Sequence, residues 1–423
     1  MFLIGIVWGD ESVEHFNESM EELRQLADTA GCEVVDTFYQ AAKRPNTSTY
    51  VGKGKLQEIK KAANNSHVHT LIFNNNLSPS QSRNISDVSG CNVVDRTEII
   101  LDIFANHART KQSKLQVELA QLEYAYTKLK RKWKHLSRIQ GGIGFRGPGE
   151  TQIEIDRREI RKKTTVLKRK IINIEQVSLT KRNKRKDITS IALVGYTNAG
   201  KSTLFNKLTD ENRYVADQLF ATLDSKTRAI ETESKENLVI TDTIGFIRKL
   251  PHKLVSSFHS TLLEVLEADL LLHVVDVSYP NLLKLMEAVE KVLQDIKVEQ
   301  KNILIVFNKT DKVNGNHYLF TKKKLINKYP DSVFISAKTG DGIDQLYKKI
   351  EEFIQRSKKC VELEIPGDMK NLISFLYKNA EIIESKYNKT ANSQALKLKI
   401  SRQLLEGIKK QIEDYELLRF INK

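Results

Sequence analysis

The sequence predicts an α/β fold divided into several domains, on three observations. First, 423 residues are too many for one small hydrophobic core, and typical domain sizes suggest roughly three units. Second, short apolar runs alternate with amphipathic helical patterns over residues 1–110. Third, a new series of apolar runs and helical patterns begins near residue 187. Such alternation is typical of parallel sheets covered by helices.

Residues 1–110 predict a small α/β domain with parallel strands. An amphipathic stretch that ends near Ala30 follows the first apolar run, and KLQEIKKAA (55–63) is the next helical pattern. The opening MFLIGIVWGD has no basic leader and no cleavage site of small residues, so it predicts a strand and not a signal peptide. The predicted strands are FLIGIV (2–7), CEVVDTFYQ (32–40), HTLIFNN (69–75) and CNVVD (91–95).

Residues 111–186 predict an antiparallel helical hairpin. Two segments with heptad spacing flank a short glycine-rich stretch, GGIGFRGPGE (141–150), and heptad helices need a partner. The alternative is that the two helices pack separately onto the N-terminal domain. The first seam comprises Leu115, Leu119, Leu122, Tyr126, Leu129, Trp133 and Leu136, and the second comprises Ile153, Ile160, Leu167 and Ile174.

The charge distribution predicts a polyanionic partner. The formal net charge is +15, and residues 157–186 contain thirteen Lys and Arg against two Glu. Nucleic acid and an anionic membrane surface both attract such a segment, whereas a merely solvated helix face is the alternative without a partner. The sequence has no amphipathic apolar anchor, which favours RNA over a membrane.

Composition excludes several other classes. No apolar run approaches the ~20 residues that a membrane-spanning helix needs. The three cysteines lie far apart and are odd in number, which supports neither a disulfide framework nor a zinc site. The expected location is the cytoplasm, with partial association with a membrane left open.

A phosphate-binding loop is predicted at residues 195–203, GYTNAGKST. The stretch fits G-x-x-x-x-G-K-[ST] and lies between the apolar run IALV and the helical pattern STLFNKL. Backbone N–H groups of such a loop surround the α- and β-phosphates, helped by the positive end of the helix. Lys201 would neutralise the β- and γ-phosphates, and the Ser202 hydroxyl would bind Mg²⁺.

Three further motifs, each after an apolar run, indicate that the nucleotide is GTP. LVITDTIGF (238–246) brings Asp242 to support Mg²⁺ and Gly245 to meet the γ-phosphate. ILIVFNKTD (303–311) ends near Asp311, whose carboxylate can accept from the two guanine N–H groups that adenine lacks. VFISAKTG (333–340) places backbone groups near the guanine O6. The predicted contacts are Gly195, Tyr196, Thr197, Asn198, Ala199, Gly200, Lys201, Ser202, Thr203, Asp242, Thr243, Ile244, Gly245, Asn308, Lys309, Asp311, Ser336, Ala337 and Lys338.

GTP hydrolysis to GDP and phosphate is the predicted reaction. We expect a threonine between the first two motifs to bind Mg²⁺ and sense the γ-phosphate, and DQLFATLDSKTR (217–228) offers Thr222, which is preferred, and Thr227. Phe246 stands where many GTPases have a glutamine that orients the attacking water. The sequence therefore predicts slow intrinsic hydrolysis that a partner completes; the alternative is that another residue of this chain positions the water. The predicted catalytic residues are Lys201, Thr222 and Gly245, and the metal residues are Ser202, Thr222 and, indirectly, Asp242.

The sequence resembles the HflX family of ribosome-associated GTPases over most of residues 1–355. Stretches of that family occur in its order: STYVGKGK (48–55), LSPSQSRN (77–84), residues 93–124 and GGIGFRGPGETQIEIDRR (141–158). Phe also follows the third-motif glycine in that family, and the resemblance assigns the switch threonine to Thr222. DSKT (224–227) departs from the family's more frequent Asp-Pro-Thr-Thr.

The resemblance implies a protein that binds the large (50S) ribosomal subunit and splits or rescues stalled 70S ribosomes under stress, and we expect it to be a monomer. It implies Mg²⁺-dependent GTP hydrolysis stimulated by the ribosome, and a hairpin that reaches 23S rRNA near the peptidyl transferase centre. GGIGFRGPGE lacks the Lys-Ser/Thr of a phosphate-binding loop and follows a helix, so it is predicted to form the hairpin tip. The predicted RNA contacts are Arg138, Arg146, Arg157 and Arg158.

Two alternatives stay open at this point, a GTPase for assembly of the large subunit and an RNA- or membrane-binding adaptor in which GTP is only structural. The predicted domains are residues 1–110, the hairpin with its basic linker at 111–186, the P-loop GTPase domain at 187–356, and a small α+β domain at 357–423. In the last domain, CVELEIP (360–366) predicts one strand, and two helical stretches are expected after it.

Overall fold

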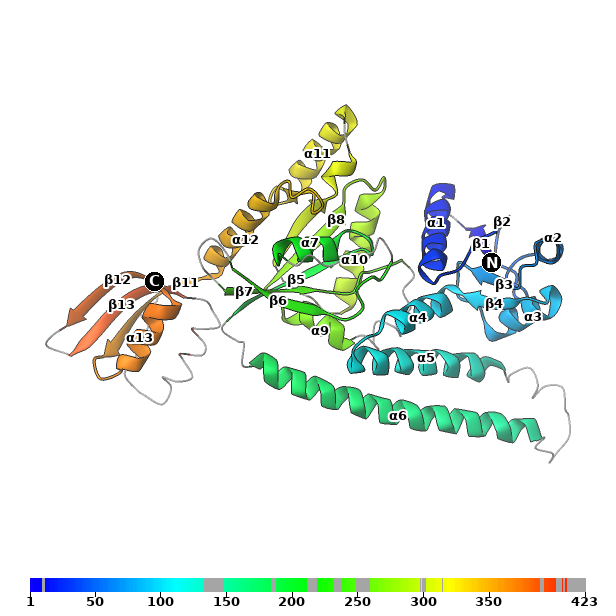
Figure 1. Cartoon of the computed structure of the whole chain (residues 1–423), viewed down its shortest axis with the longest axis horizontal. Coiled ribbons are helices and arrows are strands. Elements are labelled where there is room, and N and C mark those ends of the chain that lie inside the picture. The colour runs from blue at the N-terminus through cyan, green and yellow to red at the C-terminus, as the bar shows by residue number, and fades with distance from the viewer. Residues whose placement is uncertain are drawn as a thin grey trace.

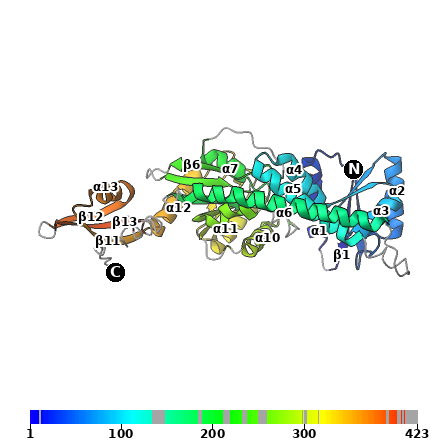
Figure 2. The ribbon, with the colours of Figure 1, turned by 90° about the horizontal axis from the view of Figure 1, so that it is seen from below.

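The structure is a computed structural model. It describes residues 1–9, 12–132, 148–183, 188–210, 219–231, 237–248, 259–296, 298, 302–313, 315–388, 392–400, 405 and 408. Three globular parts follow one another along the long axis, with the GTP-binding motifs in the middle one (Figure 1). Figure 2 shows one long helix running along the N-terminal and middle parts. The predicted α/β fold class is confirmed.

The N-terminal part is a parallel sheet covered by helices on both faces. The strand order is β2-β1-β3-β4, and every pairing is parallel. Leu3 packs in the core cluster of α1 and α4, whereas Phe2 and Ile4 pack in that of α2 and α3. Both faces are buried, which explains the nearly continuous apolar runs of these strands. The elements are β1 (Phe2–Trp8), α1 (Val13–Thr29), β2 (Asp36–Ala42), α2 (Lys53–Asn65), β3 (Thr70–Phe73), α3 (Pro79–Ser89), β4 (Asn92–Asp95) and α4 (Arg96–His107).

The predicted hairpin is formed by α5 (Lys111–Lys132) and α6 (Pro148–Asn183). Leu119 of α5 packs on Leu167 and Ile171 of α6, so the seam uses a second heptad position besides the one that includes Leu167. The alternative was that the two helices pack separately onto the N-terminal domain. It holds in part for α5, which also contacts α3 and α4 of the N-terminal part. Residues 141–147 of the predicted tip, and Trp133 and Leu136 of the seam, lie outside the described residues.

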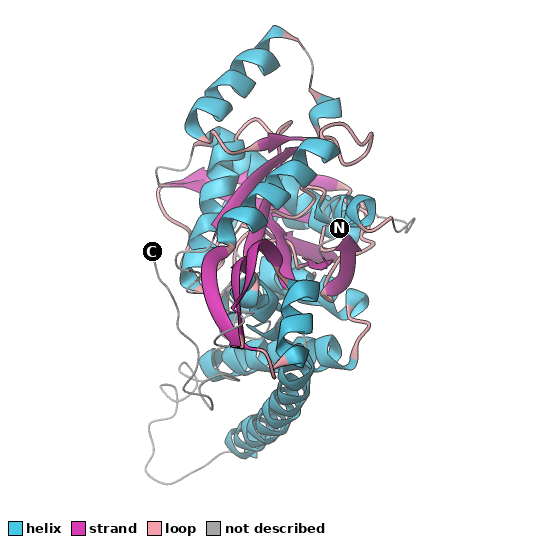
Figure 3. Cartoon of the chain, turned by 90° about the vertical axis from the view of Figure 1, so that its left-hand side faces the viewer, coloured by secondary structure: helices cyan, strands magenta, loops and turns pink. Residues whose placement is uncertain are grey.

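The middle part has a six-stranded sheet in the order β10-β9-β8-β5-β7-β6, in which only β6 is antiparallel to its neighbour. Helices lie on both sides of the strands (Figure 3). The carboxyl ends of the central parallel strands meet at one edge, where ligands of such sheets bind. The elements are β5 (Thr189–Gly195), α7 (Lys201–Leu208), β6 (Lys226–Glu231), β7 (Asn237–Asp242), α9 (His259–Glu267), β8 (Leu270–Asp276), α10 (Leu282–Asp295), β9 (Asn302–Asn308), the 3₁₀ turn η2 (Thr310–Lys312), α11 (Asn316–Lys328), β10 (Val333–Phe334) and α12 (Ile343–Ser357).

The C-terminal part contains more strand than the sequence predicted. Its antiparallel sheet has the order β11-β13-β12, formed by β11 (Lys359–Pro366), β12 (Glu381–Asn388) and β13 (Ser393–Ile400), with α13 (Lys370–Asn379) before β12. The expectation of two helical stretches therefore missed a β-hairpin. Leu396, Leu398 and Ile400 alternate into the core, a period-two signal that was present in the sequence. Strand β12 is almost wholly exposed and has no such alternation, so only its pairing with β13 reveals it.

The described helices include none that combines the length and the apolar character needed to cross a membrane.

Candidate nucleotide-binding site

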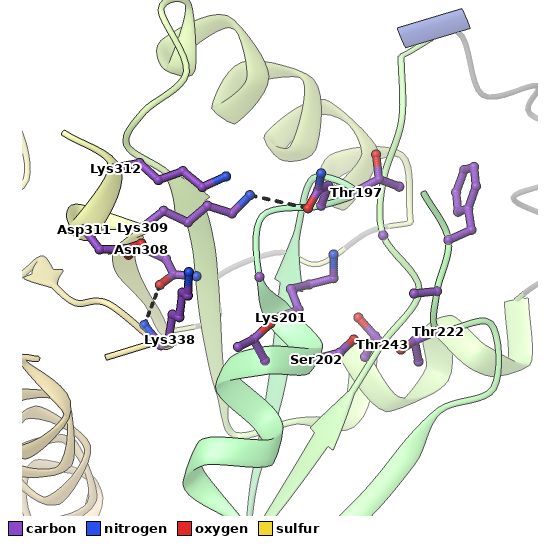
Figure 4. A pocket seen from close by; sticks show the side chains of 17 residues that line it. Thr197, Lys201, Ser202, Thr222, Thr243, Asn308, Lys309, Asp311, Lys312 and Lys338 are labelled. Carbon is purple, nitrogen blue, oxygen red and sulfur yellow. Dashed lines mark hydrogen bonds between the residues drawn. The ribbon is translucent and has the colours of Figure 1, made fainter. Parts of the chain in front are cut away.

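A pocket of about 280 Å³ opens at the carboxyl edge of the middle sheet (Figure 4). Side chains from four of the sequence motifs point into it, together with residues of the segment that precedes β6. Its lining residues are Thr197, Asn198, Gly200, Lys201, Ser202, Thr203, Phe220, Ala221, Thr222, Thr243, Gly245, Asn308, Lys309, Asp311, Lys312, Ala337 and Lys338.

Two glycines allow the phosphate-binding loop to pack against neighbouring strands. Gly195 ends β5 with a φ of +150°, and a Cβ there would lie 2.3 Å from the carbonyl oxygen of Val274 on β8. Gly200 has a φ of +91°, and a Cβ there would lie 2.2 Å from Nδ2 of Asn308. No real Cβ tolerates either approach, so any other residue would displace the loop from the sheet.

Lys201 is buried at the start of α7 and faces the pocket. Its Nζ donates to the carbonyl oxygens of Gly195 and Tyr196, at 3.2 and 2.8 Å. Burial lowers the pKa of the Lys201 ammonium to about 8. A phosphate group beside this nitrogen would favour the charged form again, so the site is suited to a polyanion.

Ser202, Thr222 and Asp242 form a cluster of oxygen atoms. Ser202 Oγ lies 2.7 Å from Asp242 Oδ2 and 2.8 Å from Thr222 Oγ1, and Thr222 Oγ1 donates to Asp242 Oδ2 at 3.0 Å. The other carboxylate oxygen, Asp242 Oδ1, is buried and has no partner among the described residues. Burial raises the pKa of Asp242. A hard cation such as Mg²⁺ prefers oxygen ligands and would favour the carboxylate form, so the cluster fits this ion.

The structure separates the two threonine candidates. Thr222 belongs to the cluster with Ser202 and Asp242, whereas Thr227 lies on β6 with its hydroxyl 3.0 Å from that of Thr241 on β7. Thr222 therefore meets the geometric requirement for a metal-binding switch residue, and Thr227 is occupied in pairing the two strands.

Phe246 joins the third motif to the phosphate-binding loop through its backbone. Its N–H donates to the carbonyl oxygen of Gly195 at 3.1 Å, and its carbonyl oxygen accepts from the N–H of Thr197 at 2.7 Å. The ring is 3% exposed and packs in the hydrophobic core cluster. An apolar buried ring cannot orient a water molecule by hydrogen bonding, so that task falls to another group.

The opposite end of the pocket is formed by the two motifs for which the sequence predicts guanine binding. Asn308 bridges two loops, because its Nδ2 donates to the carbonyl oxygen of Ala199 and its Oδ1 accepts from the N–H of Ala337, each at 2.9 Å. Asp311 Oδ1 accepts from the hydroxyl of Ser336 at 2.6 Å, which lowers the pKa of Asp311. The carboxylate is therefore ionised at neutral pH and lines the pocket.

Six of the predicted nucleotide contacts do not line the pocket. These residues lie in the same motifs but outside the pocket lining. The hydroxyl of Tyr196, for example, donates to Glu22 of the N-terminal part at 2.5 Å. Conversely, the sequence prediction missed Phe220, Ala221 and Lys312, which do line it; the position of Lys312 directly after Asp311 was the available signal. The six are Gly195, Tyr196, Ala199, Asp242, Ile244 and Ser336.

Two of the four predicted RNA contacts, Arg157 and Arg158, lie within the described residues. Arg157 is half-buried, and its Nη2 donates to the carbonyl oxygen of Leu129 at 3.2 Å, so it ties α6 to α5. Arg158 is exposed on α6. Arg138 and Arg146 lie outside the described residues.

Comparison with known proteins identifies three consecutive family segments. The model described as GTP-binding GTPase N-terminal matches residues 17–105, and the one described as GTP-binding GTPase Middle Region matches residues 107–185. The model described as 50S ribosome-binding GTPase matches residues 190–309. A solved structure of a GTP-binding protein from Sulfolobus solfataricus in complex with GDP is 28% identical, covering 84% of this chain and 98% of that chain with a TM-score of 0.44.

Full-length relatives carry one family name. The GTPase HflX of Caldanaerobacter subterraneus subsp. tengcongensis is 40% identical over 93% of this chain and 90% of the relative. The GTPase HflX of Flavobacterium psychrophilum is 43% identical over 84% of this chain and 90% of the relative. The GTPase HflX of Escherichia coli is 40% identical over 90% of each chain. Since these matches span both the nucleotide pocket and the hairpin, the chain belongs to the HflX family of GTPases.

Proposed function

We propose that this GTPase binds the large (50S) ribosomal subunit in its GTP-bound state and splits stalled 70S ribosomes. The observation that carries the proposal is the combination, in one chain, of the nucleotide pocket described above and a basic helical hairpin. The match of residues 190–309 to the family model described as 50S ribosome-binding GTPase supports the choice of partner. We further expect a cytoplasmic monomer.

Six residues in or next to the pocket have a proposed task. Ser202 and Thr222 would hold Mg²⁺, with Asp242 supporting it, and the ion would stabilise negative charge on the phosphates. Lys201 would neutralise charge on the β- and γ-phosphates, and the N–H of Gly245 would meet the γ-phosphate. Asp311 would accept from guanine, which rejects adenine because the carboxylate would then lose its donors.

Hydrolysis needs a further group, because Phe246 cannot orient water. We expect a group of the large subunit to orient the attacking water, or binding to the subunit to move a residue of this chain into a position where it can do so. Intrinsic turnover is then slow, and productive hydrolysis waits until the protein is bound. This order lets GTP hydrolysis end the interaction instead of preceding it.

The hairpin supplies a surface suited to RNA. One face of α6 packs toward α5 through Leu167 and Ile171. Most basic side chains of α6 are exposed, although Arg161 and Lys168 also contact α5. Lys and Arg on phosphates give affinity that depends little on sequence and falls steeply with salt. The exposed basic residues of the described part of α6 are Arg158, Arg161, Lys162, Lys163, Lys168, Arg169 and Lys170.

GTP turnover measured with and without purified 50S subunits, at two salt concentrations, tests the proposal. We expect 50S subunits to raise the rate by at least ~10²-fold at low salt, as stimulating partners do for other GTPases, and much less at high salt. ATP turnover should not respond. Absence of stimulation by 50S and 70S particles would refute the proposal.

A pair of matched variants separates the hairpin from general electrostatics. The triple variant R158A/K162A/K163A removes three exposed charges from α6, and K323A/K324A/K348A removes three exposed charges from α11 and α12. Only the first should abolish most of the stimulation while leaving intrinsic turnover unchanged. A subunit-assembly GTPase would instead be indicated if depletion led to immature large-subunit precursors and the protein failed to split 70S particles.

A further inference from the structure

The segment that carries Thr222 is held by the N-terminal part of the chain. We call residues 219–224 the switch I segment. Leu219, Phe220 and Leu223 are buried in a core cluster shared with α1 and α4. The ring of Phe220 packs edge-on against Phe104 of α4, with 4.7 Å between the ring centres and 82° between their planes. The switch I segment therefore contacts the nucleotide pocket on one side and packs against the N-terminal helices on the other.

Asp224, at the end of the switch I segment, binds the start of α5. Its Oδ2 accepts from the backbone N–H groups of Arg109 and Thr110 at 3.1 and 3.2 Å, and its Oδ1 accepts from the hydroxyl of Thr110 at 2.6 Å. The same Thr110 hydroxyl accepts from the N–H of Ser113 at 3.1 Å, as an N-cap does. A carboxylate from the GTPase domain therefore completes the cap of a helix that belongs to the hairpin.

The contact between Asp224 and Thr110 lies at the start of the helical hairpin, for which we propose RNA binding. Helix α5 continues from Thr110 to Leu119, which packs on Leu167 of α6. A negative charge at a helix N-terminus is stabilised by the helix dipole, so α5 is held to Asp224 by charge as well as by hydrogen bonds. Movement of Asp224 would shift or release the first turn of α5.

Thr222 and Asp224 are too close in sequence to move independently. Two residues of extended chain span at most about 7 Å, and Leu223 between them is buried. Thr222 lies in the cluster with Ser202 and Asp242, where a metal and γ-phosphate would be sensed. Any rearrangement of Thr222 on exchange of GDP for GTP must therefore reach the carboxylate that caps α5.

We propose that Asp224 is a positioning residue that transmits the nucleotide state of the pocket to the helical hairpin through the N-terminus of α5. The carboxylate caps α5 in one nucleotide state and releases or shifts it in the other, which changes how the hairpin presents its basic face. The proposal rests on the proposed function for the role of the hairpin, but the coupling itself does not require a ribosome. The opposing view is that Asp224 joins the domains equally in both nucleotide states.

Amide hydrogen exchange on the full-length protein distinguishes these views. The peptide covering residues 107–115 is followed with GDP and with guanylyl imidodiphosphate, a GTP analogue that is not hydrolysed. In the wild-type protein we expect a difference of about fivefold or more between the two nucleotides, the size that loss of one helix cap produces. In Asp224→Ala the amides should exchange fast with both nucleotides, and the difference should disappear.

Two further variants keep the result interpretable. Asp102→Ala removes an exposed carboxylate from α4 and should preserve the nucleotide-dependent difference. Asp224→Asn keeps the shape of the side chain, but its amide offers fewer acceptor sites and should give an intermediate result if Asp224→Ala unfolds locally. A difference that persists in Asp224→Ala, or that is absent in the wild-type protein, would overturn the proposal.

Binding to 50S subunits provides the second measurement. The wild-type protein should bind them more tightly with the GTP analogue than with GDP, and in Asp224→Ala the ratio of the two affinities should fall to within about twofold of one, the scatter of a neutral substitution. The pocket should still bind nucleotide, because Asp224 does not line it, but the ratio of the affinities for the GTP analogue and GDP should shift by up to about fivefold, since coupling between two sites is reciprocal. If the wild-type protein binds no ribosomal particle, the proposed function fails, while the exchange measurement still decides the coupling.

Discussion

The hydroxyl of Tyr196 in the phosphate-binding loop donates to the Glu22 carboxylate of α1 at 2.5 Å. The same hydroxyl accepts from the backbone N–H of Arg248, which follows the third motif, at 2.7 Å. Glu22 also pairs with the buried Arg96 at 2.9 Å. Burial and the Glu22 carboxylate raise the pKa of Tyr196 well above its ordinary value, so the phenol stays protonated and keeps donating. One side chain thus joins the nucleotide loop, the third motif and helix α1 of the N-terminal part.

Replacing Tyr196 with Phe should destabilise the protein without altering the shape of the loop. The change leaves a carboxylate oxygen and a backbone N–H buried without this partner, which costs about 1–3 kcal/mol of the free energy of unfolding. Chemical denaturation followed by tryptophan fluorescence measures the loss. Tyr279→Phe is the control, since Tyr279 lines the neighbouring cavity and no side-chain hydrogen bond is found for it within the described part of the chain. Equal loss in both variants would contradict this account.

Thr222→Ala and Thr227→Ala form a matched pair for the switch residue. The first removes a hydroxyl from the oxygen cluster at the metal site, and we expect GTP hydrolysis to fall by roughly 10²-fold, as when one stabilising group is removed from an active site. The second removes only the contact with Thr241 and should leave the rate nearly unchanged. Affinity for GDP should be similar in both variants. A larger effect of Thr227→Ala would reverse the assignment.

The lowered pKa of Lys201 predicts a pH-dependent affinity for GDP. Above pH 8 the empty pocket holds a neutral amine, and phosphate binding must bring a proton, so affinity should fall by up to about tenfold per pH unit. Below about pH 7 the lysine is already charged, so Lys201 itself should add no further pH dependence to the affinity. Calorimetry in two buffers at pH 8.5 should show proton uptake, and its absence would contradict burial of this amine.

The lowered pKa of Lys201 also determines how the stability of the fold depends on pH. An unfolded lysine keeps its proton up to about pH 10, whereas the folded, nucleotide-free protein releases it near pH 8. Between these values the unfolded chain binds more protons, so Lys201 makes stability increase with rising pH. Saturating GDP should remove this increase because the bound phosphates hold the proton on the lysine.

The sequence predicted those parts of the site that lie on one strand and the loop after it. The phosphate-binding loop and Asp311 follow apolar runs directly, and their spacing is local. The order of the strands then brings these loops to one edge, which a parallel α/β series implies. The assignment of the family and of GTP hydrolysis could be made at that level, and the comparisons confirm both.

Contacts between distant parts of the chain could not be predicted, because they correspond to no local pattern in the sequence. Asp224 and Thr110 are 114 residues apart, and no pattern in DSKT marks its aspartate as a helix cap. Arg157 was predicted to contact RNA as a basic residue of the hairpin, and the structure shows in addition that its guanidinium donates to a backbone carbonyl of α5. Whether a charged side chain faces solvent or a carbonyl group depends on the packing of two helices, which periodicity describes only for apolar residues.

Asp311→Asn should change which base the pocket accepts. The carboxylate offers acceptors to both guanine donors, whereas an amide presents one acceptor and one donor. Affinity for GTP should therefore fall by at least about 10²-fold, and xanthosine triphosphate, which has an oxygen in place of the guanine amino group, should bind better than GTP. Competition binding with both nucleotides measures the change. Asp341→Asn, at an exposed carboxylate nearby, should leave the preference for GTP intact.

Leu167→Ala tests whether α6 is held by its heptad seam. Leu167 is 5% exposed and packs on Leu119, so truncation should weaken the pairing of α6 with α5 by roughly 2 kcal/mol or more. Helix α6 is rich in Lys and Arg, and trypsin cuts such a helix only when it opens, so cleavage should accelerate by about 30-fold. Val166→Ala removes less apolar volume from a side chain that is 49% exposed, and cleavage should change by about twofold at most. Comparable cleavage of the two variants would show that α6 is held by other contacts, since only Leu167 of this pair lies in the seam.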